Sequence, residues 1–77
     1  MEQKDFFKAL EDAFDETNIE ALSLETKFRD LDEWSSITAL SIIASIDDAF
    51  GVTLTGDFIK SVYTLGEIYN EVKSKVK

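Results

Sequence analysis

The residues of this chain best placed for chemistry are two adjacent serines, Ser35 and Ser36. They follow Trp34 and precede Ile37, where an irregular acidic segment gives way to a strongly apolar helical run. A serine at such a junction is a natural helix cap, because its oxygen accepts a hydrogen bond from an orphan backbone N–H of the first turn. The junction also exposes a hydroxyl at the positive end of a helix dipole, where a phosphate diester would be stabilised.

The composition excludes most other chemistry. The chain contains no histidine and no cysteine. Self-contained Ser-His-Asp catalysis is therefore excluded, as are disulfides and thiolate metal sites. Asp30, Asp32 and Glu33 form an acidic cluster, and carboxylates suit hard cations, but their spacing matches no calcium loop. We accordingly predict no metal site and no enzyme.

The charge points to protein partners. Sixteen acidic residues against eight basic ones give a net charge of −8. This argues against nucleic-acid binding, which needs a basic footprint, and favours basic protein surfaces. The alternative is that the charge only keeps a small protein soluble and monomeric. No apolar run approaches membrane-spanning length and the N-terminal residues lack a signal-peptide pattern, so we expect a cytoplasmic monomer. The 77 residues predict a single domain over residues 1–77.

Helical spacing predicts a first helix over residues 3–16, with Phe6, Leu10 and Phe14 in the core. Thr17-Asn18 would end it. Residues 19–33 lack a sustained period, yet they carry too many apolar residues for a free linker: Ile19, Leu22, Leu24, Phe28 and Leu31. This segment is predicted to be a long loop pinned to the core, with one helical turn near residues 25–28.

The clearest helix is predicted over residues 36–50, and Gly51 directly after it provides the stop signal. Its core stripe is formed by Ile42, Ile46 and Phe50, broadened by Leu40 and Ile43. Its more polar side carries Thr38, Ser41, Ser45 and Asp48. Ile37 has two open interpretations, an exposed apolar contact or a hydrophobic contact that caps the helix.

The remaining chain is predicted to contain a connection and two helices. Residues 52–56 read as a connection rather than a strand, because nothing else in the chain would pair with them. A short helix follows over residues 57–62. A capping box from Thr64 to Glu67 opens a last helix over residues 65–75. Lysines at its end, Lys73, Lys75 and Lys77, oppose the helix dipole.

Taken together, these features resemble the acyl carrier proteins. That family has an Asp-Ser-Leu-type triplet at the start of its second helix, and the triplet here is Ser35-Ser36-Ile37. Trp34 matches the aromatic residue that precedes the triplet in several free-standing carriers, and residues 26–31 resemble the family's loop. Helix order, loop lengths and the Phe50-Gly51-Val52 end of the second helix agree as well. The resemblance implies an all-α, four-helix bundle with three longer helices, a short third helix and a long first loop.

The resemblance also implies a function. Ser36 would carry a covalent 4′-phosphopantetheine arm, transferred from coenzyme A by a phosphopantetheinyl transferase. The arm would hold a fatty, polyketide or aminoacyl group as a thioester and deliver it to acyl-loading and acyl-processing enzymes. The family frame places the serine directly before the aliphatic residue, which selects Ser36 over Ser35. The alternative is a cofactor-free helical interaction module in which Ser36 is only an N-cap.

The chain departs from the family on the second helix. Many carriers have acidic residues just before the serine and along the first turns, whereas this chain has Ser35, Thr38 and Ser41 there. Acidic residues return only at Asp47 and Asp48, which favours a dedicated set of partners. The expected partner-recognition residues are Trp34, Ser35, Ile37, Thr38, Ser41, Asp47 and Asp48. Phe58 and Ile59 would either pack in the core or line a pocket for a bound acyl chain, as the resemblance implies.

Overall fold

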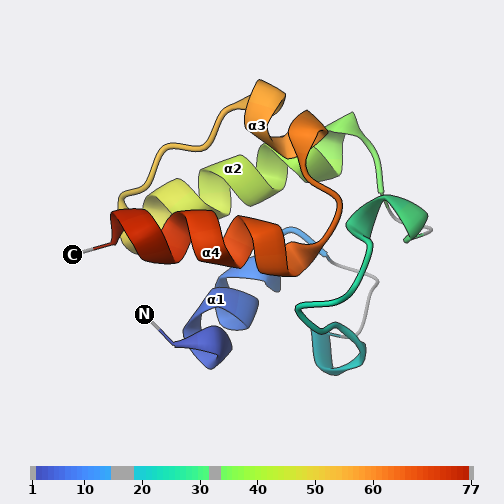
Figure 1. The fold of residues 1–77 in the computed structure, drawn as a ribbon, viewed down its shortest axis with the longest axis horizontal. Helices are drawn as coiled ribbons and strands as arrows, with labels where there is room; N and C mark the ends of the chain where they lie inside the picture. The colour runs from blue at the N-terminus through green and yellow to red at the C-terminus, as the bar shows by residue number, and fades with distance from the viewer. Residues whose placement is uncertain (1, 15–18, 32–33, 77) are drawn as a thin grey trace.

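The computed structural model describes residues 2–14, 19–31 and 34–76. These ranges contain the helices α1 (Gln3–Leu10), α2 (Ser36–Phe50), α3 (Gly56–Ser61) and α4 (Leu65–Lys75), with two single 3₁₀ turns, η1 (Ile19–Ala21) and η2 (Phe28–Asp30). Both α1 and α3 contact α2, and Figure 1 shows α3 (orange) beside the first turns of α2 (green). The predicted all-α, four-helix architecture with its long first loop is confirmed.

One apolar cluster joins the helices and the loop. The buried residues of α1 and α2 in this cluster are Phe6, Leu10, Ile42 and Ile46. The loop and the turn after α1 add Ala13, Phe14, Leu22 and Phe28, and the C-terminal half of the chain adds Val52, Leu54, Ile59, Val62, Leu65, Ile68, Tyr69 and Val72. Val52 and Leu54 lie in an extended connection that forms no strand, as predicted.

Helix α1 is shorter than predicted, since its α-helical part ends at Leu10. Beyond it lies a mixed turn with i→i+3 hydrogen bonds from Glu11 N to Lys8 O (3.2 Å) and from Ala13 N to Leu10 O (2.9 Å). An i→i+4 hydrogen bond from Phe14 N to Leu10 O (3.1 Å) closes this turn. This turn still brings Ala13 and Phe14 into the core, which is why their spacing reads as helix. The predicted end at residues 16–18 lies outside the described residues.

The long loop is pinned to the core, as predicted, chiefly by Leu22 and Phe28. The helical turn expected near residues 25–28 lies slightly later in the chain, because the described part of the loop forms its 3₁₀ turns at η1 and at η2, which begins at Phe28. Between them, the Ser23 backbone N–H donates to Thr26 Oγ1 (2.9 Å) and the Thr26 N–H donates to Ser23 O (3.1 Å). Side-chain bonds of this kind offer the backbone an alternative to a helix.

The predicted capping box opens α4. Glu67 N donates to Thr64 Oγ1 (3.3 Å), and Thr64 N donates to Glu67 Oε1 (3.1 Å). The backbone N–H of Tyr63, which also donates to this carboxylate, lowers the pKa of Glu67. The loop supplies acceptors for the next two amides, with Leu65 N donating to Thr26 O (3.1 Å) and Gly66 N to Leu24 O (2.8 Å). The start of α4 is thus built jointly by its own cap and by the loop.

Leu24 lies close to Gly66, and this contact leads to a testable prediction. A Cβ at this position would lie 2.7 Å from Leu24 O and 3.2 Å from Leu24 Cβ. Helix propensity alone favours alanine over glycine by about 1 kcal/mol. We expect the clash with Leu24 to outweigh this gain. Gly66→Ala should therefore lower the free energy of unfolding by about 1–3 kcal/mol in urea titrations.

Gly56→Ala is the matched control, because a Cβ on Gly56 meets nothing within 4 Å. It should leave the urea midpoint unchanged or raise it slightly. A Gly66→Ala protein as stable as the wild type would show that the loop does not hold α4 as closely as described.

Candidate functional site

The two serines have different roles at the start of α2. Ser35 is the N-cap, with extended backbone angles (φ −158, ψ 175), and its Oγ accepts a hydrogen bond from Thr38 N at 3.2 Å. Ser36 is the first residue of the helix and is exposed. Within the described part of the chain its hydroxyl has no hydrogen-bond partner. The interpretation of Ser36 as the N-cap is therefore wrong, and its hydroxyl is left available.

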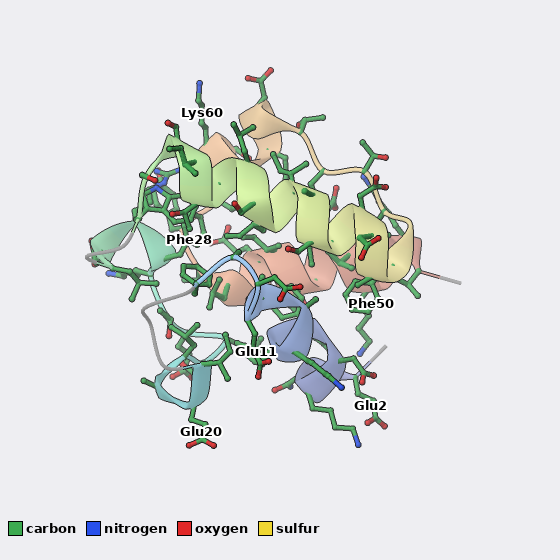
Figure 2. All side chains as sticks on the ribbon, turned by 180° about the vertical axis from the view of Figure 1, so that it is seen from behind. Glu2, Glu11, Glu20, Phe28, Phe50 and Lys60 are labelled. Atoms are coloured by element: carbon green, nitrogen blue, oxygen red, sulfur yellow. The ribbon has the colours of Figure 1, made fainter. Side chains whose placement is uncertain are left out.

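The surroundings suit an anionic group on Ser36. The first turn of this 15-residue helix contains no acidic residue, so the unpaired amides and the dipole make this end of α2 positive. Lys60, on neighbouring α3, adds a cation that projects away from the ribbon in Figure 2. Among the described residues, this helix end and Lys60 would both attract a phosphodiester attached at Ser36.

A groove begins at Ser36 and runs between α2 and α3. Its volume is about 440 Å³, within the range of small-molecule sites. The α2 side is lined by Ser36, Ala39, Leu40 and Ile43, the α3 side by Gly56, Ile59 and Lys60, and the loop adds Arg29, Trp34 and Ser35. Of the two residues considered for an acyl pocket, Ile59 lines the groove and Phe58 does not. Most of the lining is apolar, so the groove suits a hydrocarbon.

The predicted recognition residues differ in exposure: Trp34, Thr38 and Ser41 are partly or fully buried, whereas Ser35, Ile37, Asp47 and Asp48 are exposed. Trp34 is half-buried, with its ring centroid 4.6 Å from that of Phe28, and Ser41 is also half-buried. Thr38 is only 6% exposed, so its expected place on the polar side of the helix is wrong. Asp47 and Asp48 are exposed on the last turns of α2.

Two large apolar side chains are exposed on the first turns of α2. Ile37 is 73% exposed, which supports the interpretation of an open apolar contact. Leu40 is 66% exposed, so its prediction as a core residue is wrong. The sequence analysis therefore missed Leu40 as a surface residue. The available signal was that Leu40 lies three residues after Ile37, so the two side chains share one face of the helix. Arg29 and Lys60 were missed as well, because only the folded chain brings them to the groove.

The described residues include no group of three metal-ligating side chains. Asp32 and Glu33, two members of the acidic cluster, lie outside the described residues. Within the described ranges, every helix falls short of the length and apolarity that a membrane span requires.

Comparison with protein families identifies the class. A family model for the phosphopantetheine attachment site matches residues 6–72, which is most of the chain. The chain therefore belongs to the phosphopantetheine-binding carrier domains, which are not catalytic themselves and hold 4′-phosphopantetheine covalently. Comparisons with curated proteins and with solved structures give no match. An exposed hydroxyl, a positive helix end and an adjoining apolar groove fit such an arm.

Proposed function

We propose that this chain is an acyl carrier protein, acting as a single cytoplasmic, monomeric domain over residues 1–77, with its arm on Ser36. The proposal is supported mainly by the different positions of the two serines at the start of α2. Ser35 Oγ is engaged by Thr38 N, while the Ser36 hydroxyl is exposed at the first position of α2. Of these two serines, Ser36 is the one whose modification would leave the helix cap intact.

We expect an external enzyme to attach the arm, because phosphopantetheine-binding carrier domains are not catalytic themselves. A phosphopantetheinyl transferase would supply the base that takes the Ser36 hydroxyl proton and the metal that neutralises the pyrophosphate of coenzyme A. Ser36 Oγ forms a bond to the phosphorus that bears pantetheine, and the bond to the nucleotide phosphate breaks. The nucleotide leaves as adenosine 3′,5′-bisphosphate.

The bound arm supplies a thiol on which an acyl group is held as a thioester. The chain itself provides the platform. Ser35 holds the first turn of α2 in place, and Ile43 and Ile59 offer apolar walls beside the attachment point. We propose that these walls shelter part of a fatty or polyketide chain, since burial of apolar surface is favourable by about 25 cal/mol per Å².

The partner surface in this proposal has two ends. Ile37 and Leu40 provide an apolar end next to Ser36, and Asp47 and Asp48 an acidic end farther along α2. No charged residue lies between Ser35 and Ile46. A loading enzyme that fits this chain should therefore present an apolar contact near its active site, with basic residues farther away. This pattern favours a dedicated set of partners over the general fatty-acid enzymes.

The test is the intact mass of the wild-type protein after incubation with coenzyme A and a broad-specificity phosphopantetheinyl transferase. We expect a gain of one phosphopantetheine, and no gain when either coenzyme A or the transferase is omitted. If a protein shown by circular dichroism to be helical gains nothing, the carrier proposal fails. The exposed Ile37 and Leu40 would then favour the second candidate, a cofactor-free interaction module.

A further inference from the structure

Arg29 joins the long loop to the far end of α3. Its guanidinium donates to the carbonyl oxygen of Ile59 (3.1 Å) and also to that of Lys60. The same group lies 5.8 Å from the Phe28 ring centroid and 5.1 Å from that of Tyr63, within the range of cation–π attraction. One side chain thus connects the buried anchor of the loop to the carbonyl end of a helix that lies 30 residues away in sequence.

Helix α3 needs such a connection. Its six residues are far fewer than an isolated helix requires for stability in water. Thr55 closes its N-terminus by accepting a hydrogen bond from Phe58 N (3.0 Å). At the other end, Ser61 Oγ donates to Phe58 O (2.7 Å), and Arg29 donates to the next two carbonyls. A cation at the last carbonyls satisfies acceptors that a helix end leaves unpaired.

The bonded residues are also groove residues. The carbonyl of Ile59 accepts from Arg29, while the Ile59 side chain is buried and lines the groove that starts at Ser36. Arg29, Trp34 and Lys60 line the same groove, and Trp34 packs on Phe28. Any outward movement of α3 would therefore widen the groove at the attachment point.

We propose that Arg29 is a positioning residue that holds α3 against α2 and thereby sets the width of the groove beside Ser36. The guanidinium bridges two carbonyls while lying near two rings, a combination of planar shape and several donors that lysine lacks. The proposal extends the carrier function, because it makes one loop residue responsible for how closely the acyl chain is enclosed. Its first test nevertheless needs no arm and no acyl chain.

That test is amide hydrogen exchange by NMR on the unmodified protein, comparing Arg29→Ala and Arg29→Lys with Lys27→Ala. Lys27 is an exposed cation of the same loop, so its removal controls for the charge change. We expect Arg29→Ala to speed exchange at the Ile59 amide by roughly tenfold relative to the core amides of α4, as loss of a charged hydrogen bond implies. Arg29→Lys should lie between Arg29→Ala and the wild type, and Lys27→Ala should match the wild type. Unchanged exchange in α3, or an equal rise throughout α1, α3 and α4, would overturn the assignment.

The second readout uses protein loaded with acetyl- or octanoyl-phosphopantetheine by the transferase. If Arg29 sets the groove, the octanoyl thioester hydrolyses more slowly than the acetyl thioester in the wild type, and Arg29→Ala removes that difference. A general loss of stability would not change this ratio selectively. If the ratio of acetyl to octanoyl thioester hydrolysis rates in Arg29→Ala equals that of the wild type, the positioning role is wrong. Failure of the loading step itself would count against the carrier function and would leave the exchange result to decide on Arg29.

Discussion

Replacing Ser36 with alanine is expected to abolish attachment of phosphopantetheine while leaving the fold intact. The Ser36 hydroxyl is exposed and has no partner in the described part of the chain. Its removal should change the free energy of unfolding by no more than about 0.5 kcal/mol. Intact mass after the transferase reaction, together with a urea titration, measures both quantities on one preparation.

Ser35→Ala is the matched control, and its effects should be the reverse. Loss of the cap to Thr38 N is expected to lower the free energy of unfolding by about 1 kcal/mol, while the mass gain is kept. The two variants therefore separate stability from modification at neighbouring positions. If Ser36→Ala still gained an arm and Ser35→Ala did not, the roles assigned to the two serines would be exchanged.

Phe28→Ala is expected to lower the free energy of unfolding strongly. Phe28 is completely buried, and its ring contacts that of Trp34 and the guanidinium of Arg29. Truncating a buried phenylalanine costs about 3–5 kcal/mol. Domains gain roughly 0.05–0.15 kcal/mol per residue, which for 77 residues is about 4–12 kcal/mol in total. Much of the molecule's stability would therefore be lost, as a fall in the urea midpoint or an unfolded fraction by circular dichroism.

Phe58→Ala is the matched substitution, because Phe58 is an aromatic residue that is only half-buried. It should cost clearly less than Phe28→Ala. Equal losses in the two variants would contradict the view that Phe28 is the main anchor of the long loop.

The parts of the fold that the sequence predicted correctly are those determined by neighbouring residues. The bounds of α2 were right because a serine cap precedes it and Gly51, with φ 68, ends it. The start of α4 was right because Thr64 and Glu67 close each other's backbone donors within one turn. The short α3 runs from Gly56 to Ser61 rather than over residues 57–62, since Thr55 caps it one position earlier than expected.

The errors arose where packing between distant segments decides the structure. Ala13 and Phe14 are buried by a tight turn, and burial alone does not distinguish that turn from a longer helix. Leu40 is exposed and Thr38 is buried, the opposite of what their polarity predicts. The placement of Arg29 against α3 depends on a contact across 30 residues, which no local pattern encodes.

The most direct test of the central claim is to locate the arm on the wild-type protein. After the transferase reaction, tandem mass spectrometry that retains the modification can separate fragments cleaved between Ser35 and Ser36. We expect the added mass on Ser36 alone, with Ser35 unmodified. An arm on Ser35, on another serine, or on none would contradict the proposal that the free hydroxyl at the start of α2 is the attachment site.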